Sequence, residues 1–193
     1  MVTGGASGFG QAMSTKFGEA GASVVVADLN GEGAKEVAAE LPDALPFQLD
    51  VSSEKGNRSL IEATVEAYGK IDVFCANAGV PHRAKMMMRQ EVEEFDSMWA
   101  INVRSIFLAA KYCVPHMPEG SSIINTSSIG AKRPRPGLAA YYAAKGAVVT
   151  LTKAMAIELA PKIRVNAVCP VSAPTGFDMN AVGSQNLSPE AEA

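Results

Sequence analysis

The feature that most constrains the fold of this chain is its alternation of short β-branched runs with longer helical patterns. Strands are predicted at residues 23–27 (SVVVA), 71–76 (IDVFCA), 122–126 (SIINT) and 163–168 (IRVNAV). The first is almost entirely apolar, as expected for a parallel strand that is covered on both faces. Repeated strand–helix–strand units build a doubly wound parallel sheet. We therefore predict a Rossmann-type α/β fold with strand order 3-2-1-4-5-6 and helices on both faces.

The helices between these strands are predicted from apolar residues that repeat along one face. Phe9, Met13 and Phe17 define a first helix that ends at Gly18 and Gly21, and a later stripe comprises Ala144, Val148, Leu151, Met155 and Leu159. A weaker strand at residues 45–49 contains Pro46, which places it at a sheet edge because proline cannot donate to the ladder.

Composition and charge limit the class of partner. The 193 residues are 48% hydrophobic and carry a net charge of -3, which argues for one globular domain and against a broad nucleic-acid or anionic-membrane surface. Cys75, Cys113 and Cys169 lie far apart inside apolar runs and are interpreted as reduced core thiols of a cytosol-like compartment. His82 and His116 are the only histidines, so no metal site is expected. No stretch is typical of a signal peptide or a membrane span.

A glycine-rich loop, TGGASGFG at residues 3–10, leads directly into the first predicted helix. Gly4, Gly8 and Gly10 let the backbone approach a ligand closely, and the helix N-terminus favours an anion such as a pyrophosphate. Their spacing differs from the commonest dinucleotide-binding pattern, so a plain turn remains the alternative.

Two acidic residues follow predicted strands at the offsets of a dinucleotide site. Asp28 lies 24 residues after Gly4, where a carboxylate accepts hydrogen bonds from the adenosine ribose and repels a 2′-phosphate, which favours NAD over NADP. The alternative is a cap for the turn DLNGEG. Asp50, in LDVS, either meets the adenine amine or serves as an N-cap or turn residue.

Tyr141 and Lys145 are four residues apart on one predicted helix, so they share a face. Tyr141 acts as an acid or base near neutral pH only if its pKa falls well below about 10, and a neighbouring ammonium in a partly desolvated site favours that shift. A solvated surface pair is the alternative. Tyr142 is a rival tyrosine, but it stands only three residues from Lys145.

Two polar residues occupy positions suited to the same site. Ser128 follows the strand SIINT, at the edge where α/β sheets bind ligands, although an ordinary loop serine fits equally. Asn102 falls on an apolar stripe with Phe95, Trp99 and Ile106. A buried amide there must be hydrogen-bonded, and it either ties the backbone together or holds a catalytic water.

Together these residues resemble the short-chain dehydrogenase/reductase family in its single-domain branch. The matches, in family order over about residues 1–170, are TGGASGFG, NAG at 77–79, Asn102, the SS pair ending in Ser128, YYAAK at 141–145 and IRVNAVCP at 163–170. The resemblance implies that Tyr141 exchanges a proton with the substrate oxygen and Lys145 assists it while holding the nicotinamide ribose. Ser128 would bind the substrate oxygen, Asn102 would hold a water, and Asn77 would steady the central strands.

The resemblance also implies a cofactor site and the protein's class. The cofactor contacts would be Gly4, Ser7, Gly8, Phe9, Gly10, Asp28, Asp50, Val51, Asn77, Ala78, Gly79, Tyr141, Lys145, Pro170 and Thr175. The implied protein is a cytoplasmic NAD-dependent oxidoreductase that interconverts a secondary alcohol and a ketone. It would act on a small molecule and form a homo-oligomer through helices at residues 91–113 and 138–159.

The chain departs from the family pattern at both ends. The first strand is a stub, Val171 stands where the family usually has glycine, and no seventh strand is expected. We expect residues 1–170 to form the NAD-binding domain and residues 171–193 an irregular tail, the remnant of a substrate lid. The alternatives are a nucleotide-binding or scaffolding fragment with impaired catalysis, and an epimerase or dehydratase related to the family.

Two segments bear on the substrate. Lys132, Arg133 and Arg135 lie in GAKRPRPG at residues 130–137 and either attract an anionic substrate or form a solvated loop. The methionines at 86–88 either line an adaptable apolar entrance or fill a core gap.

Overall fold

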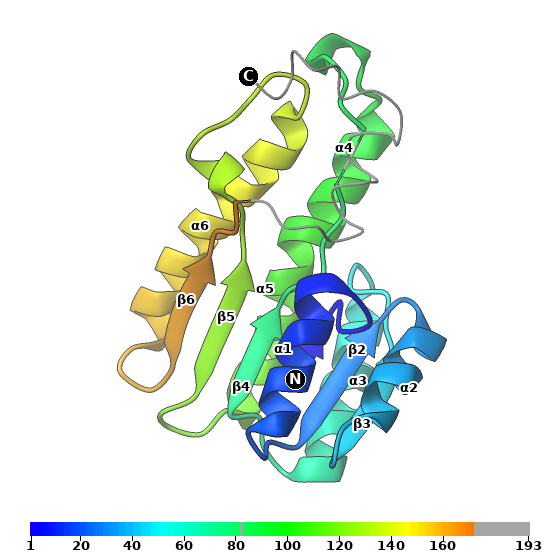
Figure 1. Cartoon of the computed structure of the whole chain (residues 1–193). Coiled ribbons are helices and arrows are strands. Elements are labelled where there is room, and N and C mark those ends of the chain that lie inside the picture. The colour runs from blue at the N-terminus through cyan, green and yellow to red at the C-terminus, as the bar shows by residue number, and fades with distance from the viewer. Residues whose placement is uncertain (82, 172–193) are drawn as a thin grey trace.

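The computed structural model describes residues 1–81 and 83–171, and within them it contains one six-stranded parallel sheet. The strand order is β3-β2-β1-β4-β5-β6, which confirms the predicted Rossmann topology (Figure 1). The strands are β1 (Val2–Thr3), β2 (Val24–Asp28), β3 (Ala44–Gln48), β4 (Val73–Ala76), β5 (Ser122–Thr126) and β6 (Arg164–Val168).

Helices cover both faces of this sheet. The helices α1 (Gly8–Glu19) and α2 (Gly31–Ala39) lie on the face toward the viewer in Figure 1, and α3 (Glu54–Tyr68), α5 (Ser105–Cys113) and α6 (Ala139–Leu159) lie behind it. The helix α4 (Val92–Trp99) extends beyond the loop edge of the sheet and continues into α5 through a π-helical segment (Ala100–Arg104). Short 3₁₀ turns occupy η1 (Met87–Arg89), η3 (Val114–His116) and η4 (Ile129–Ala131).

The short first strand still occupies the centre of the sheet. Val2 pairs with Val26 of β2 on one side and with Cys75 of β4 on the other. The strand β3 lies at the edge, with Pro46 opposite Val26, as its proline predicted. Because all strands are parallel, their carboxyl ends meet at one edge, and the loops that follow them share that edge.

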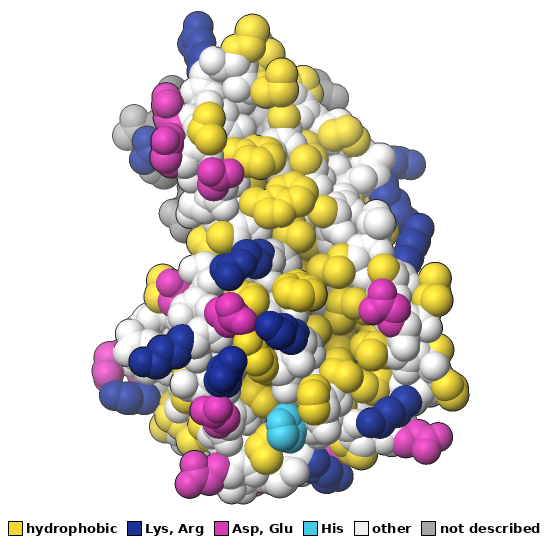
Figure 2. Space-filling view, turned by 180° about the vertical axis from the view of Figure 1, so that it is seen from behind, with side chains coloured by type: hydrophobic (Ala, Val, Ile, Leu, Met, Phe, Trp, Pro, Cys, Tyr) yellow, Lys and Arg dark blue, Asp and Glu magenta, His cyan; other side chains and the backbone are white. Residues whose placement is uncertain are grey.

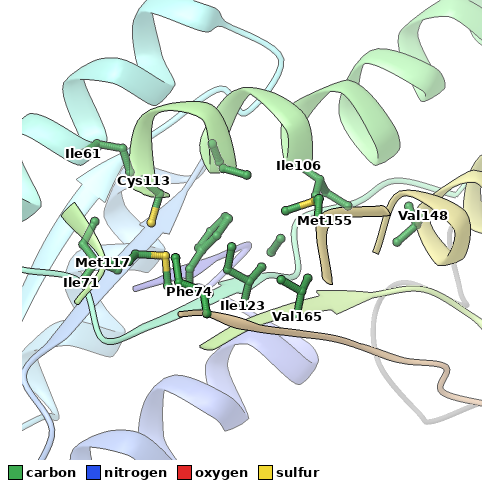
Figure 3. Close-up of a cluster of buried hydrophobic side chains, with 14 residues drawn as sticks. Ile61, Ile71, Phe74, Ile106, Cys113, Met117, Ile123, Val148, Met155 and Val165 are labelled. Atoms are coloured by element: carbon green, nitrogen blue, oxygen red, sulfur yellow. The ribbon is translucent and has the colours of Figure 1, made fainter. Parts of the chain in front are cut away.

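The largest core lies between the sheet and the helices α3, α5 and α6. Figure 3 shows Phe74 and Ile123 among the side chains of Ile106, Cys113 and Met155. Phe74 is 1% exposed and Cys113 is fully buried. This packing holds α5 and α6 against the sheet and so fixes the segments that carry the candidate site.

The predicted apolar stripe of the first helix is confirmed for two of its three residues. Met13 and Phe17 are half-buried and pack against the core. Phe9 is 42% exposed, and the fully buried side of the helix consists of Gly10, Ser14 and Gly18. These small residues let α1 approach the sheet and α2 closely. The helix ends at Glu19, between Gly18 and Gly21 as predicted, and a Cβ at Gly18 would stand 2.9 Å from the Leu41 side chain.

The predicted helix at residues 91–113 is a helical path interrupted by a π-helical turn. Phe95 and Trp99 stack on each other with ring centroids 5.8 Å apart and stay partly exposed, so they are not the core stripe that the pattern predicted. Met98 is the buried residue of α4. A π turn adds a residue per turn and rotates later side chains, which brings Asn102 inward.

The prediction that all three cysteines lie in the core is confirmed for two of them. Cys75 and Cys113 are buried free thiols, but Cys169 is only half-buried, because it follows β6 at the loop edge of the sheet rather than in the core.

Among the described residues, no helix combines the length and the apolar character that a membrane span requires. Of the predicted tail at residues 171–193, residues 172–193, with Thr175, lie outside the described residues.

Candidate active site

The glycine loop forms a tight backbone turn between β1 and α1. Gly4 and Gly8 adopt positive φ angles of 64° and 52°, and a Cβ at Gly10 would overlap the Gly4 carbonyl group. The N-cap residue Ser7 makes no side-chain hydrogen bond to the helix, whereas Asn30 and Ser53 cap α2 and α3. The first N–H groups of α1 have no partner inside the helix and suit an anion. The cradle therefore fits a pyrophosphate.

Asp28 stands beside this loop at the end of β2. Its Oδ2 accepts a hydrogen bond from the Ala6 backbone N–H at 3.0 Å, and its Oδ1 accepts one from the Asn30 N–H at 2.9 Å. Asn30, not Asp28, caps α2, through a 3.1 Å bond from the Gly33 N–H. The carboxylate thus joins the glycine loop to the next turn, and each oxygen keeps a lone pair for a further donor.

Asp50 forms a local turn at the end of the third strand. Its Oδ1 accepts hydrogen bonds from the Ser52 backbone N–H at 2.9 Å and from the Ser52 hydroxyl at 2.7 Å. This is the turn geometry that the sequence left open as an alternative. Next to it, Val51 is 9% exposed, and its carbonyl accepts a 2.8 Å hydrogen bond from the fully buried Asn57.

Asn77 connects three strands where they end at the loop edge. Its Nδ2 donates to the carbonyl oxygens of Thr3 at 3.1 Å and Gly4 at 3.3 Å, and its Oδ1 accepts from the Thr126 hydroxyl at 3.3 Å. The Thr3 hydroxyl in turn accepts from the Ala78 N–H at 3.2 Å. Asn77 therefore links the glycine loop to the ends of β4 and β5.

Asn102 reaches the loop after β4 from the π-helical segment. It is 1% exposed, its Oδ1 accepts from the Val80 N–H at 3.2 Å, and its Nδ2 donates to the Val80 carbonyl at 3.0 Å. A Cβ at Gly79 would stand 2.6 Å from Asn102 Oδ1 and 3.3 Å from Lys145 Nζ. Only glycine leaves Asn102 and Lys145 this close to the Gly79 backbone.

Lys145 is a buried ammonium at the centre of this edge. It is 3% exposed, and its Nζ donates to the Thr126 carbonyl at 2.9 Å. Desolvation lowers the pKa of Lys145 from 10.5 to about 8, and the nearby Cys169 thiol opposes this in part. The Nζ lies 5.7 Å from the centre of the Tyr141 ring. The alternative of a solvated surface pair is therefore wrong for Lys145.

Ser128 follows β5 in an extended conformation and caps the short turn η4. Its hydroxyl accepts a hydrogen bond from the Gly130 N–H at 3.1 Å and remains able to donate. The Ile129 N–H donates to the Pro170 carbonyl at 2.9 Å, which places Pro170 beside this turn. Ser128 and Pro170 therefore share the loop edge with Lys145.

One contact of this site escaped sequence reasoning. The hydroxyl of Ser127, which is buried, donates to the Lys145 carbonyl at 2.8 Å and so ties α6 to the end of β5. The adjacent serines in NTSS indicated such a contact, because two neighbouring residues in an extended segment point to opposite sides. One serine faces the helix and the other is left for the loop edge.

The predicted substrate segments lie on the surface of the same end of the molecule. Met86, Met87 and Met88 are 57%, 70% and 86% exposed, so they do not fill a core gap. The loop that carries them joins the segment before α6 through a 2.9 Å hydrogen bond from the Lys85 N–H to the Gly137 carbonyl. The basic residues Lys132, Arg133 and Arg135 are exposed in that second segment.

Comparison with known proteins gives consistent matches over nearly the whole chain. A family model described as enoyl-(acyl carrier protein) reductase matches residues 4–193. The short-chain dehydrogenase/reductase SDRA of Arabidopsis thaliana is 37% identical over 97% of this chain and 75% of its own length. The 4-formylbenzenesulfonate dehydrogenase TsaC1/TsaC2 of Comamonas testosteroni is 36% identical over 96% of this chain and 77% of its own length.

A solved structure agrees with the fold in detail. The crystal structure of 3-ketoacyl-(acyl-carrier-protein) reductase from Brucella melitensis, complexed with NADH, superimposes with a TM-score of 0.89 at 41% identity. The match covers 93% of this chain and 77% of that one. Both the sequence and the arrangement of strands are therefore shared with these oxidoreductases.

Proposed function

The chain belongs to the short-chain dehydrogenase/reductase family, and from this premise we propose that it is an NAD-dependent oxidoreductase that interconverts a secondary alcohol and a ketone. The observation that carries the proposal is the buried Lys145 ammonium, which lies 5.7 Å from the Tyr141 ring at the sheet edge that also holds the glycine loop. An uncompensated buried cation destabilises a fold, so its presence at a ligand-binding edge supports a functional role.

The glycine loop and the loop after β4 would hold the cofactor. The N–H groups at the start of α1, around Ser7, Gly8 and Phe9, suit the diphosphate, and Asp28 suits the adenosine ribose. Asp50 and Val51 would border the adenine, Ala78 and Gly79 the ribose, and Pro170 and Thr175 the nicotinamide. NAD, when bound, supplies or accepts the hydride.

Tyr141 would exchange a proton with the substrate oxygen. The Lys145 ammonium favours the phenolate form through its positive charge and would also donate to the nicotinamide ribose. Ser128 would donate its free proton to the substrate oxygen and so stabilise negative charge that develops there. Asn102 would keep a water between Lys145 and solvent, while its bonds to Val80 hold its amide in place.

The preference for NAD over NADP is part of the proposal. Asp28 places a carboxylate beside the glycine loop, and such a charge repels a 2′-phosphate. The NADH in the Brucella complex supports NAD as the cofactor to test first.

The substrate is proposed to be a small carbonyl compound or alcohol with an anionic group. The exposed Lys132, Arg133 and Arg135 support this, as do the aromatic sulfonate and the acyl-carrier substrates in the names of two relatives.

A cytoplasmic location is also part of the proposal, because Cys75 and Cys113 are free thiols.

A homo-oligomer is proposed through the helices behind the sheet. Figure 2 shows hydrophobic side chains gathered in a band down this face. Exposed apolar residues on α4, α5 and α6 include Phe95, Trp99, Phe107 and Ile157, with Phe107 54% and Ile157 80% exposed. Burial of such a band between two copies is favourable, which supports pairing through these helices.

The experiment is NADH binding by fluorescence, followed by turnover of NADH with a panel of ketones that contains 3-oxoacyl thioesters and ketones with a sulfonate or carboxylate group. Tyr141→Phe should reduce turnover at least about 100-fold, because it removes the proton-transfer group, and should leave NADH affinity within about twofold. Unchanged turnover in Tyr141→Phe would refute the assignment. Wild-type binding without turnover would instead favour the nucleotide-binding fragment, an alternative that the comparisons do not favour.

A further inference from the structure

Tyr142, the neighbour of the proposed acid–base residue, packs directly against the turn that carries Ser128. A Cβ added at Gly130 would overlap the Cδ1 and Cε1 atoms of the Tyr142 ring. Gly130 is buried, so its Cα surface is covered by this ring rather than by solvent. The ring therefore limits how far the Gly130 backbone can move toward α6.

The Gly130 backbone in turn holds the Ser128 hydroxyl. The Gly130 N–H donates to Ser128 Oγ at 3.1 Å, which is the N-cap hydrogen bond of the η4 turn. On the other side of the turn, the Ile129 N–H donates to the Pro170 carbonyl at 2.9 Å. The turn is thus held between the chain after β6 and the Tyr142 ring.

The remaining contacts of Tyr142 anchor its ring. Its N–H donates to the Leu138 carbonyl at 3.0 Å in the first turn of α6, and its ring meets the Tyr141 ring edge-on with centroids 5.7 Å apart. Both tyrosines are half-buried. One helical turn therefore carries the proposed proton-transfer residue and a support for the serine opposite it.

We propose that Tyr142 is a positioning residue for Ser128: its ring fixes Gly130, and Gly130 fixes the serine hydroxyl. This rests on the proposed function for its kinetic consequence but not for its structural one. The role needs the ring and not the phenol oxygen, which separates it from Tyr142 acting as a rival acid or base.

The structural test is amide hydrogen exchange of Gly130, measured by NMR on the whole chain. Tyr142→Ala should speed exchange of the Gly130 amide at least about tenfold, and Ser128→Ala should do the same, because each loosens the Gly130 N–H bond. Tyr142→Phe should match wild type. If Gly130 exchange in Tyr142→Ala equals wild type, the inference is overturned, whatever the enzymatic result.

The kinetic test is a double-mutant cycle with NADH and the best panel substrate. Tyr142→Ala should lower kcat at least about tenfold without changing the KM for NADH, and Tyr142→Phe should restore kcat. Adding Tyr142→Ala to Ser128→Ala should change kcat by less than about twofold, because the ring acts through the serine. Multiplying losses in the double variant would contradict that route, as would a Tyr142→Phe variant as impaired as Tyr141→Phe.

Two further variants test whether the effect is specific to the contact between Tyr142 and Gly130. Gly130→Ala disturbs the same contact from the other side and should reproduce the faster exchange and the lower kcat. Tyr68→Ala removes a half-buried tyrosine at the end of α3, at the opposite edge of the sheet, and should change neither. If Tyr142→Ala does not fold, amide exchange at residue 130 is measured in Tyr142→Leu and in Gly130→Ala instead. Exchange at the wild-type rate in both variants would overturn the inference. Absence of turnover in the wild type would refute the proposed function, and the exchange data would still decide the positioning role.

Discussion

Replacing Lys145 with methionine should stabilise the fold at neutral pH while it removes activity. Methionine keeps the length of the side chain but has no charge to desolvate. In the folded chain Lys145 is 3% exposed and its pKa is lowered from 10.5 to about 8 by burial. A difference of about 2.5 pKa units corresponds to about 3 kcal/mol of destabilisation at pH 7, where Lys145 is protonated in both states.

The dependence on pH has a definite sign. Between pH 8 and 10.5 the folded chain has released the Lys145 proton, while the unfolded chain still binds it, so stability rises with pH in this window. From pH 7 to pH 9.5 the wild type should gain about 2 kcal/mol relative to Lys145→Met. Burial raises the pKa values of the Cys75 and Cys113 thiols, which act in the opposite direction, but both proteins contain them and the difference removes their effect.

The assay is urea unfolding followed by circular dichroism at pH 7, 8, 9 and 9.5. Lys153→Met is the matched control, because Lys153 lies on the exposed side of the same helix and its removal should leave the pH profile parallel to wild type. Turnover with the panel substrate should be lost in Lys145→Met alone. A stability difference between wild type and Lys145→Met that stays constant across these pH values would refute the reasoning.

Three other substitutions test separate parts of the proposal. Gly10→Ala adds a methyl group that overlaps the Gly4 carbonyl, and it should weaken NADH binding at least about tenfold in a fluorescence titration. The control is Gly146→Ala, which should bind NADH like wild type because a Cβ at Gly146 meets no atom within 4 Å. Asp28→Ala should narrow the NADH/NADPH affinity ratio and also weaken NADH binding, because the Ala6 N–H loses its acceptor; an unchanged ratio would contradict the ribose contact. Phe107→Glu should shift the mass measured by light scattering toward that of one chain, and an unchanged mass would count against pairing through α5.

The positions of the strands were predictable because they follow from local patterns, and their order then follows from the Rossmann topology. A short β-branched run such as residues 122–126 is typical of a buried parallel strand, and its observed bounds agree with the prediction. Hydrophobicity predicted the contacts of Met13 and Phe17 on α1 with the core, but not the full burial of Gly10, Ser14 and Gly18, which are buried for their small size. Close helix packing leaves no hydrophobic signal in the sequence.

The residues of the candidate site were predictable from the sequence, but the burial of Lys145 and its contacts were not. The four-residue spacing places Tyr141 and Lys145 on one face of any helix. The burial of Lys145 depends on Thr126 at the end of β5 and on Gly79 in the loop after β4, which the fold brings to α6. For Asp28 the sequence left two alternatives, ribose contact or turn cap, and the carboxylate in fact bonds to the Ala6 and Asn30 N–H groups at once.

The buried ammonium also explains why α6 must be anchored so firmly. Lys145 sits on the same helix as Val148 and Met155, which are 0% and 8% exposed within the main core. Full burial of two such side chains contributes on the order of 3–6 kcal/mol, which is of the same order as the about 3 kcal/mol that the charged Lys145 costs at neutral pH. The apolar half of the helix therefore keeps a destabilising charge in place at the loop edge.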